Sequence, residues 1–304
     1  MKRKTQHSTI TVGIPTCYGG QSLVETVRSI RKAKNGNTVR IMIIADRTPI
    51  TPVVADALIK LRTELTWNPV EGSQTKKVKQ MIGKTTSDIY ISTQDDITFD
   101  ENTINEILNA FENDTSLTMA GIRIFPLPPE TYFEAAMGSM VRIVDTIAQL
   151  WNDTHNHLAS SGRCLAFRTT HLKRFRIPEN VVNSDMFYYL ENKRLDGTFR
   201  QLAKALVYIR CPQKLKDQIA PSSRYLYSKK EMQKHFSQKL DTEYRIPILL
   251  LLWAFTKELA CHPLPIVYYL FIRIYTLVVR QSKGVVSNPV WKVELSTKNS
   301  GSTS

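Results

Sequence analysis

An apolar run that ends in two adjacent acids is the feature that most constrains the fold of this chain. Residues 88–97 read Asp-Ile-Tyr-Ile-Ser-Thr-Gln-Asp-Asp-Ile, and the β-branched and aromatic residues among them indicate a buried strand. Residues 98–102 then predict the start of a helix with an acidic first turn. Open α/β sheets bind ligands where their strands end, and the carboxylates of Asp95 and Asp96 suit Mg²⁺ or Mn²⁺ with a phosphorylated substrate. A polar turn with Asp96 or Asp100 as a helix cap also explains the stretch.

The segments before this run predict a parallel sheet with crossover helices. In order they are a strand over residues 9–16, a helix over 22–34, a strand over 39–46, a helix over 53–65 and a helix over 75–85. This β-α-β-α-α-β order is typical of parallel sheets with right-handed crossovers. The second strand also ends in an acid, Asp46. Acids at the ends of two parallel strands would gather at one edge of the sheet.

The segments after the run continue the same α/β pattern. They are a helix over 104–111, a strand over 117–125, a glycine turn and short strand over 160–168, a helix opening at 169–173, a helix after Asn183 with Ser184 or Asp185 as its cap, and a strand over 202–210. We therefore predict one α/β catalytic or binding domain over residues 1–240. The tail, residues 296–304, is low in complexity and is expected to be disordered.

The charge of the chain narrows the classes of partner. The 304 residues carry a formal net charge of +14, which favours nucleic acid, an acidic membrane surface or a phosphorylated small molecule. The four cysteines are far apart in the sequence, which argues against both a disulfide framework and a zinc site. The basic amino terminus is not followed by the apolar core of a signal peptide. We therefore expect a cytoplasmic protein.

Two apolar segments near the carboxyl terminus differ in composition from the rest of the chain. They cover residues 246–255 and 264–279, and each is shorter or more interrupted by charge than the roughly 20 apolar residues of a spanning helix. Basic residues flank them: Lys229, Lys230, Lys234 and Lys239 before, and Arg280, Lys283 and Lys292 after. We predict that residues 241–295 form helices lying on the cytoplasmic face of an anionic membrane. A buried helical hairpin and a transmembrane hairpin are the alternatives.

Taken together, residues 8–240 resemble family 2 glycosyltransferases of the GT-A fold, a Rossmann-like fold with a mostly parallel central sheet. The matching segments are Ile14-Pro-Thr-Cys-Tyr18, Asp46, residues 72–84 with Lys79 at an arginine position, Gln94-Asp-Asp96, Ser161-Gly-Arg-Cys-Leu-Ala-Phe-Arg168 and Ser184-Asp185. Each motif is short and common, and the resemblance depends on their order and spacing.

The resemblance implies an inverting transfer of a sugar from a nucleotide-diphosphate donor, a UDP- or GDP-sugar, to a hydroxyl acceptor. The acceptor would be lipid-linked or a growing glycan at the membrane surface. The implied roles are donor binding by Pro15, Thr16, Tyr18, Asp46, Lys79, Asp95 and Asp96, binding of Mn²⁺ or Mg²⁺ by Asp96 and Asp95, acceptor-side contacts by Ser161, Gly162 and Arg163, and general-base catalysis by Asp185.

The chain also departs from the family pattern. Gln94 replaces the first acid of the Asp-x-Asp motif, Ser184 replaces the glutamate before the base, and Arg210 stands where many relatives have a histidine. Lys79 is equally well explained as a solvated lysine on a basic helix. Two other functions stay open: a nucleic-acid-binding protein, which the net charge allows but the scattered basic residues do not favour, and a relative of the glycosyltransferases that binds without catalysis.

Overall fold

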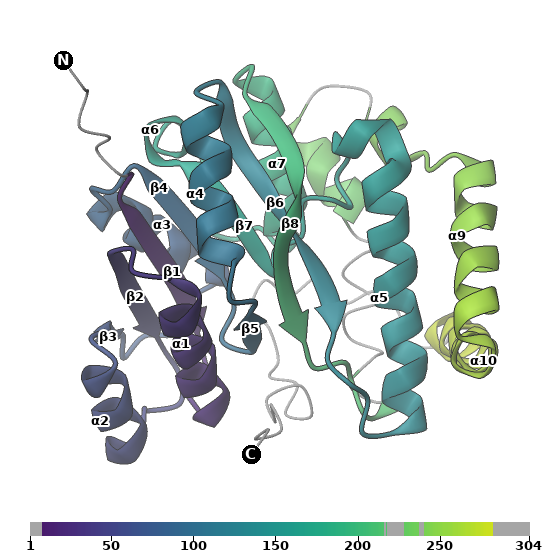
Figure 1. The fold of residues 1–304 in the computed structure, drawn as a ribbon, viewed down its shortest axis with the longest axis horizontal. Coiled ribbons are helices and arrows are strands. Elements are labelled where there is room, and N and C mark those ends of the chain that lie inside the picture. Colours follow the sequence, from purple (N-terminus) through teal and green to yellow (C-terminus); the bar gives the residue numbers. More distant parts are fainter. Residues whose placement is uncertain (1–7, 216, 218–227, 237–239, 282–304) are drawn as a thin grey trace.

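The fold is that of a computed structural model, which describes residues 8–215, 217, 228–236 and 240–281, without the side chains of the last five. One eight-stranded sheet forms its centre, in the order β3-β2-β1-β4-β7-β6-β8-β5 (Figure 1). The strands are β1 (Ile10–Thr16), β2 (Val39–Ala45), β3 (Glu64–Trp67), β4 (Ile89–Thr93), β5 (Ile97–Phe99), β6 (Leu117–Pro126), β7 (Cys164–Arg168) and β8 (Thr198–Ile209). Only β7 and β5 run against the others, because their pairings with β4, β6 and β8 are antiparallel. The carboxyl ends of the remaining strands therefore share one edge of the sheet.

Helices cover both faces of the sheet. They are α1 (Gln21–Ala33), α2 (Pro52–Lys60), α3 (Gln74–Lys84), α4 (Thr103–Asn113), α5 (Tyr132–Leu150), α6 (Thr169–Leu172), α7 (Ser184–Arg194), α9 (Ile248–Cys261) and α10 (Pro263–Gln281). Side chains of α1, α4 and α5 share one apolar core, and those of α3 and α7 share the other. Successive side chains of a strand point to opposite faces of the sheet, so each strand contributes to both cores. Ile41 and Ile43 of β2 belong to the first core, and Met42 and Ile44 belong to the second.

Two predictions about the elements are wrong. The helix expected over 53–65 ends at Lys60, because Arg62 adopts a left-handed backbone (φ 56°) and the chain turns back into β3, which pairs with β2. The helix expected directly after Ile97 begins only at Thr103, because residues 97–99 form β5 and pair with β8. Helix α5 was not predicted from the sequence, although its 19 residues make it one of the longest helices of the described chain.

The two apolar carboxyl-terminal segments form the helices α9 and α10, which pack against α5 at one end of the molecule (Figure 1). We call this pair the hairpin. The Arg142 guanidinium of α5 binds Glu258 of α9 in an ion pair of 2.7 Å, with the glutamate almost fully buried. The outer surface of the hairpin remains apolar: Leu249 and Leu264 are 78% and 77% exposed, and Trp253 and Phe271 are also exposed. Within the described ranges, no helix has the length and apolar character needed to cross a membrane.

Candidate functional site

The acids predicted at the strand ends do meet at one edge of the sheet. β1 pairs with both β2 and β4, so Thr16, at the end of β1, lies between Asp46 and Asp95. The Thr16 hydroxyl donates a hydrogen bond to Asp95 and accepts the backbone N–H groups of Tyr18 and Gly19 at 3.2 and 3.1 Å. One buried threonine therefore fixes both an acid and the loop that follows β1. We call Asp46, Asp95 and Asp96 the strand-end acids.

Asp46 occupies a buried, positively charged niche. Its Oδ2 accepts the Gly72 N–H at 2.8 Å and pairs with the Lys77 ammonium at 2.7 Å. Both side chains are at most 5% exposed. Its other oxygen, Oδ1, is buried and forms no hydrogen bond among the described residues, although the Arg47 Nε lies 3.7 Å away. A buried acceptor in this state is suited to an N–H donor of a ligand, such as that of a nucleobase.

Strand register places Arg163 beside the acid pair. β4 and β7 are antiparallel with Thr93 opposite Cys164, so the next pair along is Gln94 and Arg163. The Arg163 Nη1 donates to Gln94 Oε1 at 2.8 Å and contacts Asp96 Oδ1 at 3.4 Å. The Asp96 side chain is 7% exposed and that of Arg163 is 33% exposed. A guanidinium predicted for the acceptor side thus reaches the strand-end acids.

Asp185 lies in the first turn of α7, where backbone N–H groups bind its carboxylate. Oδ1 accepts the Met186 N–H at 2.9 Å and Oδ2 accepts the Gly162 N–H at 3.2 Å. A Cβ added to Gly162 would lie 3.3 Å from the Asp185 Cβ, so glycine allows the backbone to approach the acid. Ser184 is the first residue of α7 and Asn183 is its N-cap, without a side-chain cap bond, so the capping role expected of Ser184 or Asp185 is wrong.

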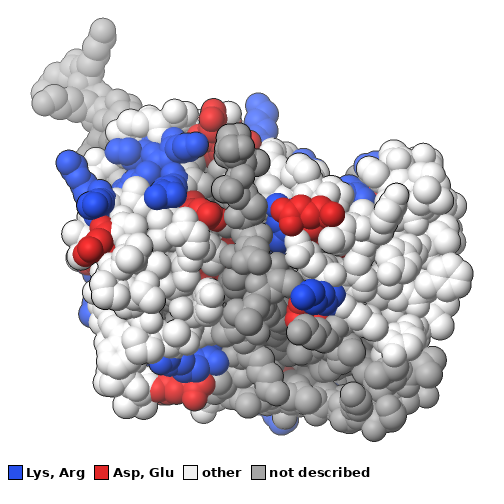
Figure 2. All heavy atoms as spheres, turned by 90° about the horizontal axis from the view of Figure 1, so that it is seen from below, with Lys and Arg blue, Asp and Glu red and all other residues white. Residues whose placement is uncertain are grey.

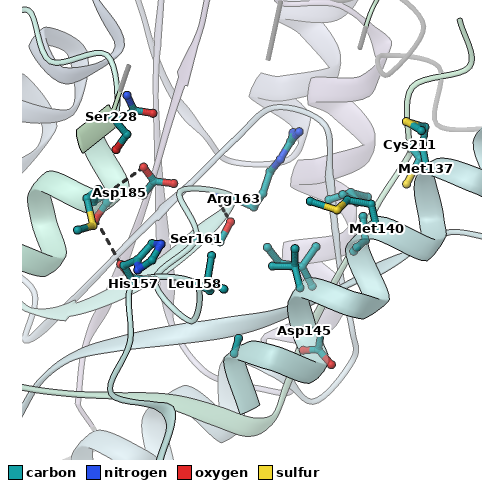
Figure 3. A pocket seen from close by; sticks show the side chains of 18 of the residues that line it. Met137, Met140, Asp145, His157, Leu158, Ser161, Arg163, Asp185, Cys211 and Ser228 are labelled. Atoms are coloured by element: carbon teal, nitrogen blue, oxygen red, sulfur yellow. Dashed lines mark hydrogen bonds between the residues drawn. The ribbon is translucent and has the colours of Figure 1, made fainter. Parts of the chain in front are cut away.

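A cavity of about 440 Å³ opens beside Asp185. Figure 3 shows Asp185, Ser161 and Arg163 on one side of it and Met137 and Met140 of α5 on the other. Its wall also includes Val141 and Val144 of α5 and Tyr269 and Arg273 of the hairpin. We call it the α5 cavity. Its wall is largely apolar but includes two carboxylates, those of Asp185 and of Asp145, which pairs with Arg123. Sites for ligands with an apolar portion combine such features.

Buried polar groups brace the α5 cavity. Arg210 binds the Pro128 carbonyl at 2.8 Å and Glu134 of α5 at 2.9 Å, which joins the end of β8 to the start of α5. Because the Arg210 guanidinium binds the Glu134 carboxylate, the role of Arg210 is to hold these two elements together. Burial raises the pKa of the neighbouring Cys211 thiol to about 12, so this cysteine stays protonated and unreactive at neutral pH.

His157 also lies in the wall of the α5 cavity. Its ring packs against Trp151 and Tyr244, with centroids 5.5 and 5.1 Å apart. Burial lowers the pKa of His157 to about 4, against a smaller opposing effect of Glu243. The imidazole is therefore neutral at physiological pH.

The strand-end acids fit a divalent cation in part. Asp95 and Asp96 offer the hard oxygen ligands that Mg²⁺ and Mn²⁺ prefer, and Mg²⁺ commonly binds one or two carboxylates together with substrate phosphates. Asp95 already accepts the Thr16 hydroxyl, and Asp96 faces Arg163. No cluster of three or more His, Cys, Asp or Glu side chains suited to a metal occurs in the described part of the chain. The residues suit a metal that arrives with a nucleotide rather than one held by protein ligands alone.

The remaining residues named from the motifs differ in burial. Pro15 is buried in β1, Tyr18 is half-buried after it, and Ser161 lies in the cavity wall. Lys79, however, is exposed on α3, whereas Lys77 points inward to Asp46. The helical period could have identified Lys77, because it precedes the buried Met81 by four residues and so shares its face.

Figure 2 looks onto the edge at which the parallel strands end. Acidic and basic side chains lie close together on this face. The side that carries the hairpin in Figure 1 is almost free of charged atoms, in keeping with its exposed leucines and aromatic residues. The charged edge and the apolar hairpin thus occupy different parts of one molecule.

Comparison with known proteins identifies the fold. No protein-family model matches the sequence, and no curated protein matches it significantly. The structure is similar to that of a mannosyltransferase from Pyrobaculum calidifontis in complex with GDP-Man and Mn²⁺, with 12% identity, a TM-score of 0.57, and coverage of 93% of this chain and 77% of that one. It is also similar to a mycobacterial protein, with 11% identity, a TM-score of 0.51 and coverage of 73% of each chain. The predicted GT-A fold is confirmed.

Proposed function

We propose that this protein is an inverting glycosyltransferase that moves a sugar from a UDP- or GDP-linked donor to a hydroxyl acceptor. The observation that carries the proposal is the position of Arg163. It contacts Asp96 among the strand-end acids and also lines the α5 cavity beside Asp185. A charged edge suited to a nucleoside diphosphate and a cavity with a carboxylate therefore adjoin, as transfer between two substrates requires.

The donor would lie along the strand-end acids. Asp46 accepts an N–H of the base through its buried Oδ1, and the loop of Pro15, Thr16 and Tyr18 surrounds the nucleoside. Asp95 and Asp96 are the residues that would hold Mn²⁺ or Mg²⁺. When bound, such a metal neutralises charge that develops on the diphosphate leaving group. Lys79 stays a predicted contact whose side chain lies on the exposed face of α3.

The acceptor would enter the α5 cavity and meet Asp185. Its hydroxyl oxygen attacks the anomeric carbon from the face opposite the diphosphate, a new C–O bond forms, and the bond to the phosphate oxygen breaks with its electron pair. Asp185 takes the hydroxyl proton as general base, with its carboxylate oriented by the Gly162 and Met186 N–H groups. Ser161, Gly162 and Arg163 lie on the acceptor side of this arrangement.

The apolar wall of the α5 cavity favours an acceptor with an apolar portion, such as a lipid-linked sugar or glycan. The hairpin contributes Tyr269 to this wall and exposes apolar side chains on its outer surface. We propose that residues 241–295 rest on the cytoplasmic face of an anionic membrane and so bring the cavity to its acceptor. The flanking Lys239, Lys283 and Lys292, the side chain of Arg280 and the tail 296–304 lie outside the described residues.

The test of the activity is a panel of nucleotide sugars with Mn²⁺, read as release of nucleoside diphosphate. Thermal unfolding with UDP or GDP plus Mn²⁺ should show stabilisation by at least one nucleotide. An oligonucleotide is the comparison ligand. Stabilisation by the oligonucleotide alone would refute the proposal in favour of a nucleic-acid-binding protein. Stabilisation by a nucleotide with no turnover of any donor would indicate a relative that binds without catalysis.

Flotation with liposomes tests the membrane proposal separately. Full-length protein should float with anionic liposomes, less so at high salt. Trp253 and Phe271, both exposed on the hairpin, should contribute through burial in the interface, so their replacement by serine should reduce flotation. Replacing the exposed Val53 of α2 by serine is the matched control, since α2 lies away from the hairpin. Equal flotation of the unmodified protein, the variant with both hairpin replacements and the Val53 control would contradict the hairpin's role.

A further inference from the structure

We propose that Arg163 is a resident cation of the donor site, which binds the diphosphate directly and lets nucleotide binding persist when divalent metal is removed. The inference rests on the proposed function, since it concerns the same donor site. It changes the role of Arg163 from an acceptor-side contact to a shared contact at the boundary of both substrates.

Backbone pairing fixes the place of Arg163. The Thr93 hydroxyl donates to the Arg163 carbonyl at 2.9 Å, next to the pair formed by Thr93 and Cys164. The backbone of Arg163 is therefore fixed beside the end of β4, where the acids converge. A contact with Gln94 of 2.8 Å and a longer one with Asp96 of 3.4 Å orient its Nη1. A phosphate oxygen can replace the longer contact without disturbing the shorter one.

Gln94 makes this cluster less negative than an acid at the same position would. Gln94 orients the guanidinium through a neutral carbonyl oxygen, whereas an acid at that position would neutralise it. The two carboxylates of Asp95 and Asp96 together with Arg163 carry a formal net charge of −1. An aspartate at position 94 would make this −2. The glutamine thus weakens attraction for a divalent cation and lowers the repulsion of an anion, which the planar fork of donors on Arg163 is well suited to bind.

The same position serves the bond-breaking step. As the bond between the anomeric carbon and the phosphate oxygen breaks, the electron pair remains on the diphosphate. Arg163 lies between the strand-end acids and the α5 cavity, so its guanidinium can donate to that oxygen as negative charge accumulates. Asp185 receives the proton of the acceptor on the other side of the reacting carbon. No group outside the two substrates and these side chains is needed to balance the step.

The test is calorimetric binding of UDP and GDP to the full-length protein, in Mn²⁺ and in EDTA. Unmodified protein should keep measurable affinity for one diphosphate in EDTA. Arg163→Gln should weaken that affinity by about 10- to 100-fold, the usual effect of a lost hydrogen bond to a charged group. The loss should be smaller in saturating Mn²⁺, and Arg163→Lys should restore part of the affinity. Gln94→Asp should lower the affinity for the diphosphate in EDTA. It should also increase the factor by which Mn²⁺ raises that affinity.

Controls separate this role from a structural one. Arg40→Gln removes an arginine that pairs with Glu64 at the edge of the sheet, and it should bind both nucleotides normally. Uridine and guanosine lack phosphate, so their binding should not change in Arg163→Gln. Equal weakening of nucleoside and diphosphate would overturn the inference. Binding that requires Mn²⁺ absolutely would overturn it and leave the proposed function intact, whereas no nucleotide binding in either condition would overturn both.

Discussion

The edge of the sheet that carries the strand-end acids, which we call the donor edge after its proposed function, and the α5 cavity are built in different ways. At the donor edge, short polar side chains at strand ends bond to one another: Thr16 to Asp95 and Lys77 to Asp46. At the cavity, the Asp185 carboxylate faces a wall formed by the packing of α5 and the hairpin. Short motifs in the sequence specify the first arrangement, whereas the second depends on the relative placement of long helices. Side chains at strand ends can thus keep their arrangement while a cavity between helices changes with the placement of the helices.

Removing the base should have the largest effect and should separate the two regions. Asp185→Asn keeps the shape of the side chain but cannot accept the acceptor proton. We expect turnover to fall by about 10²–10⁴-fold, with UDP or GDP affinity unchanged because the donor edge is intact. Release of nucleoside diphosphate and calorimetry measure the two quantities. Asp114→Asn, at a half-buried acid after α4, is the control. Near-normal turnover of Asp185→Asn would remove Asp185 from the mechanism.

Asp46→Ala should disrupt the packing of charged side chains at the donor edge itself. It leaves the Lys77 ammonium buried without its partner, which typically costs about 3–5 kcal/mol of stability. The double variant Asp46→Asn, Lys77→Met removes both charges, and should recover most of the stability without recovering nucleotide binding. Urea unfolding and calorimetry on the same samples measure these outcomes. If the double variant bound nucleotide normally, Asp46 would be a structural residue only.

The sequence predicted the donor edge better than the cavity for a physical reason. Parallel strands end at a common edge, so Asp46 and Asp95 could be placed together from strand order alone. Arg163 was assigned to the acceptor side, because its contact with Gln94 depends on antiparallel register, which a motif does not contain. Helix α5 was missed entirely. Its apolar residues were recognisable, but which of them line a cavity is decided by α10 packing against α5 from more than a hundred residues away.

Asp96→Ala should have an intermediate effect that depends on metal. In Mn²⁺, nucleotide affinity should fall by about tenfold through loss of one charged ligand. In EDTA it should not fall, because the variant also removes the carboxylate that competes for Arg163. Calorimetry in both conditions measures the difference. Equal losses with and without metal would instead indicate that Asp96 stabilises the turn after β4.

His157 offers the smallest effect and tests how the cavity wall is packed. Burial holds its pKa at about 4, below the value near 6.5 of an unfolded chain, so protonation favours unfolding. The neutral ring contributes stability that is fully present above about pH 6.5 and is lost as the pH falls toward 4. Between pH 7.5 and 5.5 this linkage amounts to about 1 kcal/mol. His157→Phe keeps the contacts with Trp151 and Tyr244 and removes the proton site, so its stability should decline less over this range. Urea unfolding at both pH values compares it with the unmodified protein and with His155→Phe, which replaces an exposed histidine. If His157→Phe lost stability as steeply as the unmodified protein, the imidazole would have to be hydrated in solution, and the wall of the α5 cavity would be open at this point rather than packed.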